Sequence, residues 1–203
     1  MAEDYSLATR AQKGDLDAFN QLVLKYQELA FNIAYRILSD PAGADDATQT
    51  AFISAYRKIT SYRGGSFKAW LMRIVTNACY DELRRQKRRP TTSLEPINDD
   101  TGEEMESPGW LADDSLGPEQ QLEVGELDKA VQHCLDNLPT DFKVVAVMID
   151  VEGLDYQAVS EAVGKPLGTI KSRLSRARQR LQTCLQSFQE LLPQKYRLES
   201  GIR

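Results

Sequence analysis

Apolar residues recur three and four positions apart in both halves of this 203-residue chain. In the first half this spacing predicts a long helix over 19–37, a second over 47–59 and a third over 70–89. In the second half it predicts helices over 122–138, 142–151, 156–163 and 167–181. Proline and glycine interrupt the runs, and no segment shows the alternation of a half-buried strand. The sequence therefore predicts an all-α fold.

The charge is distributed unevenly between these regions. The chain as a whole has a formal net charge of -5, but residues 1–93 hold 14 Lys and Arg against 10 Asp and Glu. Residues 94–128 hold 12 acidic residues and no basic one, and residues 129–203 hold 11 basic and 8 acidic residues. We therefore expect two small helical domains, 1–93 and 119–203, joined by an acidic extended linker over 94–118. Gly109-Trp110-Leu111 is the one apolar spot in this linker and a candidate docking motif.

Several classes of protein are disfavoured by the sequence. No run of 18 apolar residues predicts a membrane span, and the first residues lack the basic and apolar parts of a secretory signal. The three cysteines, Cys79, Cys134 and Cys184, are odd in number and far apart. That spacing argues against a disulfide framework and against a zinc site, and favours buried thiols over redox sensors. We expect a cytoplasmic protein without metal or cofactor.

Residues 154–181 have the layout of a helix-turn-helix: a short helix, a turn at Gly164 and a longer second helix. In DNA-binding proteins the second helix enters the major groove. If Ile170, Leu174 and Leu181 face inward, a basic and polar face is left outward or on the flanks. This predicted face comprises Lys171, Ser172, Arg173, Ser175, Arg176, Arg178 and Arg180. The alternative is the solvated basic surface of an ordinary bundle helix.

A second candidate site lies in the first domain, where aromatic residues surround a glycine loop at Gly64-Gly65. Aromatic rings beside cations are suited to unstacked, single-stranded bases. The predicted site comprises Tyr62, Phe67, Trp70, Asn77, Asp81, Arg84, Arg85, Lys87 and Arg88. Two alternatives remain open: Phe67 and Trp70 belong to the core, and the basic cluster is a solvated helix end favoured by the helix dipole.

Together these motifs resemble the extracytoplasmic-function group of the sigma-70 family, the bacterial transcription initiation factors. Gly14-Asp15 with Phe19, Leu22 and Tyr26 resembles the start of the family's region 2. The loop Tyr62-Arg63-Gly64 with Trp70-Leu71 resembles the part that opens and reads the -10 element, and Asn77 stands where the family contacts that strand. The segment 168–178, which includes Thr169, resembles region 4, which reads the -35 element.

The resemblance also implies partners. Asp46, Gln49 and Phe52, with Ser54, correspond to the motif that binds the clamp helices of core RNA polymerase. Further implied partners are the polymerase flap, promoter DNA in duplex and single-stranded form, and an anti-sigma protein, with a stress response as the setting. The two promoter elements lie about 70 Å apart, at ~35 Å per helical turn. The linker 94–118 spans about 80 Å when fully extended at ~3.3 Å per residue, so it can bridge them.

The chain departs from the usual family pattern in three places, one of which is a glycine loop before Trp70 about one residue shorter than in some relatives. Thr50 replaces a common acid beside Gln49, which affects the expected clamp contact. Asp155, Ala158 and Ser160 differ from the usual residues of the first helix of the helix-turn-helix, which affects its expected phosphate contacts.

Three other functions fit the sequence less well. A helix-turn-helix repressor or activator that binds duplex DNA unaided explains the second domain but not the aromatic loop or Gln49 and Phe52. An enzyme is disfavoured, because the only histidine, His133, adjoins Cys134 on a helix, where neighbouring side chains point about 100° apart. A structural helical adaptor explains none of the motifs.

Overall fold

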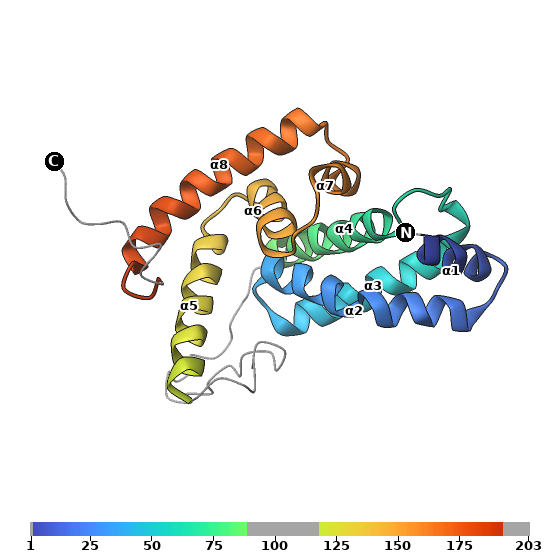
Figure 1. Ribbon diagram of the computed structural model, residues 1–203, viewed down its shortest axis with the longest axis horizontal. Helices are drawn as coiled ribbons and strands as arrows, with labels where there is room; N and C mark the ends of the chain where they lie inside the picture. Colours follow the sequence, from blue (N-terminus) through green and yellow to red (C-terminus); the bar gives the residue numbers. More distant parts are fainter. Residues whose placement is uncertain (1, 89–117, 193–203) are drawn as a thin grey trace.

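The computed structural model describes residues 2–88 and 118–192, and within these residues it contains helices and no strand. The all-α prediction is therefore confirmed, and the helices form two lobes (Figure 1). The candidate docking motif Gly109-Trp110-Leu111 lies outside the described residues, as does most of the predicted linker.

The helices of the first lobe are α1 (Ala2–Gln12), α2 (Leu16–Leu38), α3 (Pro41–Arg57) and α4 (Phe67–Arg88). Those of the second are α5 (Pro118–Asp136), α6 (Thr140–Ala146), α7 (Tyr156–Val163) and α8 (Leu167–Leu185).

Helix boundaries in the first lobe follow local capping chemistry. Asp15 precedes α2, and its carboxylate accepts a hydrogen bond from the Ala18 amide (3.0 Å). Ser39 ends α2 in the left-handed conformation, and Asp40 then caps α3, whose first residue is Pro41. The apolar faces of these helices meet in a core that includes the fully buried Leu22, Ile33, Ile37, Leu71 and Met72.

In the second lobe, α6 continues into a single wide turn over Val147–Val151, and α7 and α8 follow as the predicted helix-turn-helix. Asp155 caps α7 by accepting a hydrogen bond from the Ala158 amide (2.8 Å). Gly164 ends α7 with a φ of 67°, a conformation that glycine adopts without steric cost. The inward positions Ile170, Leu174 and Ala177 are buried as predicted, whereas Leu181 is only half-buried.

The cysteines correct one expectation. Cys134 of α5 and Cys184 of α8 form a disulfide with Cα atoms 5.7 Å apart, so the argument against disulfides was wrong for this pair. The two residues are 50 positions apart in sequence, but α5 and α8 lie against each other in the second lobe. Cys79 of α4 is a free buried thiol, as expected, and burial raises its pKa to about 12.

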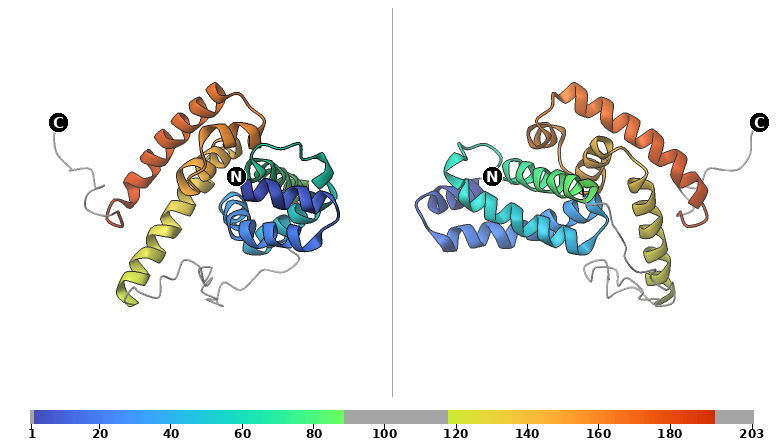
Figure 2. Two further views of the ribbon diagram at one scale, coloured as in Figure 1. Left: turned by 45° about the vertical axis from the view of Figure 1, so that its right-hand side comes forward. Right: turned by 180° about the vertical axis from the view of Figure 1, so that it is seen from behind.

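The two lobes are in contact, and their buried residues form one continuous core. The main contact places α7 of the second lobe on α4 of the first, and the views from both sides show these helices adjacent (Figure 2). Smaller contacts join α2 to α5 and α6. The sequence did not predict this arrangement.

Polar groups also cross the contact between the lobes. The buried Arg36 of α2 pairs with Asp128 of α5 and donates a hydrogen bond to Gln132 (3.1 Å). The buried ammonium of Lys143 of α6 donates to the Ile37 carbonyl (3.0 Å). Burial of a cation is costly without partners, so these contacts stabilise one arrangement of the lobes over others.

Candidate nucleic-acid and polymerase interfaces

The aromatic loop of the first lobe is built on a cluster of three rings. Tyr62 and Phe67 have ring centroids 5.5 Å apart, and Trp70 lies 5.6 Å from Tyr62 and 5.4 Å from Phe67. Tyr62 is 5% exposed and Phe67 2% exposed, whereas Trp70 is half-buried. Tyr62 and Phe67 therefore belong to the core. Trp70 is the ring of the three that reaches solvent.

The loop between these rings has a defined shape. Gly64 and Gly65 have φ values of 95° and 86°, where other residues are strained. The Tyr62 hydroxyl donates to the Gly65 carbonyl (2.8 Å), which closes the loop across its base. Arg63 is exposed at its tip.

The polar face of α4 is open to solvent. Asn77 and Arg88 are exposed, Arg84 pairs with Asp81 one turn earlier, and Arg85 pairs with Glu82 at 2.8 Å. Both partners of the Arg84–Asp81 pair are exposed, and such pairs are weak, so Arg84 is available to an anion, whereas Arg85 pairs with a largely buried Glu82. The structure therefore brings the predicted residues of the first domain together on one loop and one helix.

The outward face of α8 is exposed as predicted, with Thr169 and Arg173 half-buried at its edge. Lys171, Ser172, Ser175 and Arg176 are all exposed. Within the described residues, neither Lys171 nor Arg176 has an ion-pair partner. These two cations are therefore open to an anion without the displacement of a protein ion pair.

Three arginines of α8 are instead engaged within the lobe. Arg173 pairs with Asp141 (2.5 Å), and Arg178 makes two hydrogen bonds to Asp150 (3.0 and 2.6 Å). The Arg180 guanidinium lies over the ring of Phe142, 5.6 Å from its centroid. These partners lie on α6 and on the turn that follows it, and no sequence pattern indicates them.

The first lobe carries an open groove of about 930 Å³ between α2 and α3. Its apolar part includes the exposed Ile53 and the half-buried Phe52, and Gln49 lies beside them. The full lining is Val23, Gln27, Glu28, Phe31, Asp45, Thr48, Gln49, Phe52 and Ile53. Exposed apolar side chains in a groove are typical of a protein-binding surface.

Two of the four predicted polymerase-binding residues line this groove, Gln49 and Phe52. Asp46 lies on another side of α3, in a hollow shared with Asp81 and Arg85, and the half-buried Ser54 does not line the groove. Sequence reasoning missed Ile53, which is 53% exposed. The sequence spacing could have indicated this residue, because Ile53 follows Gln49 by four positions and so lies on the same face of the helix.

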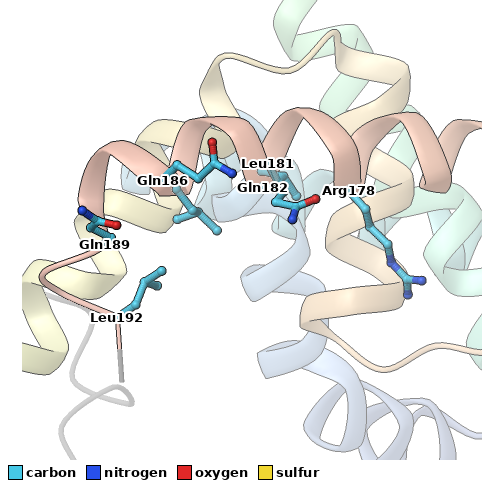
Figure 3. Close-up of a pocket in the computed structure, with 7 residues that line it drawn as sticks. Arg178, Leu181, Gln182, Gln186, Gln189 and Leu192 are labelled. Atoms are coloured by element: carbon cyan, nitrogen blue, oxygen red, sulfur yellow. The ribbon is translucent and has the colours of Figure 1, made fainter. Parts of the chain in front are cut away.

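A second, smaller hollow of about 370 Å³ lies along the carboxyl-terminal half of α8. Leu181, Leu185 and Leu192 supply its apolar lining, and Arg178, Gln182, Gln186 and Gln189 supply its polar lining (Figure 3). Within residues 2–88 and 118–192 no helix is long and apolar enough to cross a membrane. The same part of the chain contains no group of three or more potential metal ligands.

Comparison with known proteins identifies two family regions that correspond to the two lobes. Residues 22–89 match the family Sigma-70 region 2, and residues 128–181 match Sigma-70, region 4. The chain is 35% identical to the RNA polymerase sigma-H factor of Pseudomonas aeruginosa over 91% of its length and 94% of the relative's. It is 36% identical to the ECF RNA polymerase sigma-E factor of Escherichia coli over 90% and 94%.

Two solved structures share the fold. One is CnrH in complex with the cytosolic domain of CnrY (TM-score 0.66, 22% identity, 91% of this chain and 98% of that one). The other is the sigma factor RpoE of Bartonella quintana in complex with the anti-sigma factor NepR (TM-score 0.62, 27% identity, 82% and 96%). With region 2 and region 4 both matched in order, and with relatives above 30% identity along nearly all of its length, this chain belongs to the extracytoplasmic-function group of the sigma-70 family of RNA polymerase sigma factors.

Proposed function

We propose that this chain is a bacterial transcription initiation factor that binds core RNA polymerase and directs it to promoters by reading the -10 and -35 elements. Residues 1–93 form the region 2 domain, which binds polymerase, reads the -10 element and assists melting. Residues 94–118 form the linker, and residues 119–203 form the region 4 domain, which reads the -35 element. The protein acts by binding, without a catalytic step of its own.

The observation that carries this proposal is the presence, in one chain, of the α2/α3 groove and an exposed basic helix-turn-helix. In a repressor that binds duplex DNA unaided, the groove that holds Phe52 and Ile53 would have no binding partner. We assign this groove to the clamp helices of core polymerase. Asp46 and Ser54 stay candidates for the margin of that contact.

For the -10 element, the proposed contacts divide by exposure. Trp70, Arg63 and Asn77 reach solvent and are assigned to the separated strand, where one stacked base contributes about 1–3 kcal/mol. Tyr62 and Phe67 are buried and are assigned to support the loop from below. Arg84, Arg85 and Arg88 follow on the exposed side of α4 and are assigned to the backbone phosphates. Asp81 is assigned to orient Arg84 through their ion pair.

For the -35 element, Lys171, Ser172, Ser175 and Arg176 are assigned to the major groove. A bidentate contact from a cation to guanine discriminates by about 1–3 kcal/mol. Thr169, Arg173, Arg178 and Arg180 are assigned to the flanking phosphates. Asp155 serves as the cap of α7, so its departure from the family pattern is accommodated by the fold.

Two further partners follow from the surfaces. The hollow along the carboxyl-terminal half of α8 is assigned to the polymerase flap, with Arg178 at the boundary between this hollow and the proposed DNA face. The RpoE relative was solved with an anti-sigma factor. We infer that an anti-sigma protein of this chain would compete with polymerase for the α2/α3 groove.

The test is transcription reconstituted with purified core polymerase across genomic promoter fragments, with start sites mapped. We expect specific start sites only when the protein and core are both present. Ile53→Asp is expected to abolish them, whereas Leu16→Asp, at an equally exposed apolar position outside the groove, is not (53% and 57% exposed). Tight and specific binding of duplex DNA by the free protein in gel shifts would instead favour the unaided repressor.

A further inference from the structure

The last residue of α1 reaches the aromatic loop from outside the segment that forms it. The half-buried Gln12 side chain donates hydrogen bonds through Nε2 to the Ile59 carbonyl (3.0 Å) and to the Tyr62 carbonyl (2.7 Å). These partners lie 47 and 50 residues further along the chain. One amide group thus binds both ends of the short 3₁₀ turn Ile59–Ser61.

That turn is where the loop begins. Tyr62 follows it directly, and its hydroxyl closes the loop onto the Gly65 carbonyl. At the other end, Ser66 accepts a hydrogen bond from the Ala69 amide (3.1 Å) and so caps α4. The segment Arg63–Gly65 is therefore held between two fixed points, and Gln12 fixes the first.

Helix α1 is itself firmly held, so Gln12 is a fixed reference for the loop. Leu7, Ala8 and Ala11 are buried in the core of the first lobe. Near the start of α1, Asp4 accepts hydrogen bonds from the Tyr26 hydroxyl (2.8 Å) and the Lys25 ammonium (2.6 Å). A side chain added at Gly64 would also lie 3.6 Å from the Tyr5 ring, so α1 borders the loop at a second point.

We propose that Gln12 is a positioning residue for promoter reading: through the Ile59 and Tyr62 carbonyls it holds the loop in the shape that selects a -10 base. This inference rests on the proposed function of the loop. A loop with two glycines has many accessible conformations when it is not held. Fixing it before DNA arrives removes an ordering cost from binding and keeps the loop from adjusting its shape to an incorrect base, so both the affinity for the correct base and the discrimination against others depend on it.

The experiment compares Gln12→Met, which keeps the length and volume but loses both donors, with Gln12→Glu, whose oxygens only accept. Gln21→Met, at an exposed position of α2, is the matched control. Each variant is reconstituted with core polymerase and tested on a promoter set with single base changes in the -10 or in the -35 element. Core affinity and thermal unfolding of each variant are measured in parallel.

We expect Gln12→Met and Gln12→Glu to lower transcription from the best -10 sequence about tenfold, the effect of two lost hydrogen bonds, and to reduce discrimination among -10 variants. Discrimination at the -35 element and affinity for core should stay within twofold of the Gln21→Met control. Unchanged -10 discrimination would overturn the inference. So would an equal loss at both elements together with weaker core binding, because that pattern marks a general loss of structure. If the unmodified protein showed no promoter selectivity, the proposed function itself would fail.

Discussion

Tyr80 of α4 donates a hydrogen bond to Asp141 of α6 (3.0 Å), across the contact between the two lobes. The same carboxylate pairs with Arg173 of α8 (2.5 Å). Burial, and then the charge of Asp141, raise the pKa of Tyr80, so the phenol stays protonated and remains a donor. One acid therefore links the helix proposed to read the -10 element to the helix proposed to read the -35 element.

Replacing Asp141 by asparagine is expected to loosen the lobes and to release Arg173. The Arg173 ion pair is lost and the Tyr80 hydrogen bond is weakened, at a cost of about 1 kcal/mol, since Asp141 is half exposed. Fluorescence energy transfer between labels at Asp17 of α2 and Gln157 of α7, both exposed and in different lobes, should report a longer mean distance. Asp150→Asn is the control, because Asp150 pairs with Arg178 within the second lobe. Equal transfer in both variants would contradict the role of Asp141.

The contact between the lobes is also expected to break when polymerase and promoter bind. Elements about 70 Å apart cannot both be reached while α7 rests on α4. The same label pair should show high energy transfer in the free protein and low transfer in the promoter-bound holoenzyme. Persistent high transfer in a complex that protects both elements from cleavage would show that the lobes stay together.

The structural features that could be predicted from the sequence are those determined by residues close together in the chain. The caps Asp15 and Asp155 and the turn at Gly164 act within a few residues, and the helices they bound could be predicted. The Cys134–Cys184 disulfide and the hydrogen bond from Lys143 to the Ile37 carbonyl join residues 50 and 106 positions apart. The periodic spacing of apolar residues does not indicate which distant residues will pair in this way.

The candidate sites show the same division. Periodicity placed the exposed face of α8 correctly, because Ile170 and Leu174 mark its buried side. It could not separate Trp70 from Tyr62 and Phe67, because an aromatic ring suits a core and a base stack equally well and only the packing of α1, α2 and α4 decides.

Asp4 predicts a pH dependence of stability. Burial raises its pKa, but the hydrogen bonds from Lys25 and Tyr26 outweigh burial and leave the pKa below its usual value of 3.8. A carboxyl with a lowered pKa in the folded state stabilises the fold above its unfolded pKa, and this contribution is lost as the pH falls through the folded value. Asp4→Asn should therefore lower the free energy of unfolding by about 1–3 kcal/mol at pH 7.

Denaturant unfolding from pH 7 downward measures this difference between Asp4→Asn and the unmodified protein. The difference should be constant from pH 7 to pH 5 and should shrink below about pH 4, where the unfolded carboxyl takes up its proton first. Asp17→Asn, at an exposed position in the first turn of α2, provides the comparison. A difference that grew on acidification would mean that Asp4 has a raised pKa.

The disulfide between Cys134 and Cys184 is expected to stabilise the second lobe. A crosslink between residues 50 positions apart stabilises by about 4 kcal/mol in the chain-entropy account, through restriction of the unfolded chain. Reduction with dithiothreitol should lower the melting temperature of the unmodified protein. The double variant Cys134→Ser, Cys184→Ser should melt at the lower temperature in both conditions, and identical melting of the oxidised and reduced protein would contradict this expectation.

Arg176 and Arg178 are two residues apart on α8 but are expected to affect DNA binding differently. Arg176 is exposed without an ion-pair partner, whereas Arg178 is held by two hydrogen bonds to Asp150. Arg176→Ala should weaken holoenzyme binding by about 1–3 kcal/mol on the best -35 sequence and relax the preference at one base pair. Arg178→Ala should act evenly across -35 sequences and by less, because in the unmodified protein a phosphate contact must first displace Asp150.

Titrations of holoenzyme with promoter fragments that differ singly in the -35 element separate the two effects. For Arg178→Ala the dependence of affinity on salt should decrease by up to one phosphate contact, with sequence preference retained. For Arg176→Ala the affinities of the fragments should converge at one position only. Convergence with Arg178→Ala instead would mean that Arg178 leaves Asp150 in the complex and that the ion pairs of the α8 arginines within the protein do not decide which arginine reads the DNA.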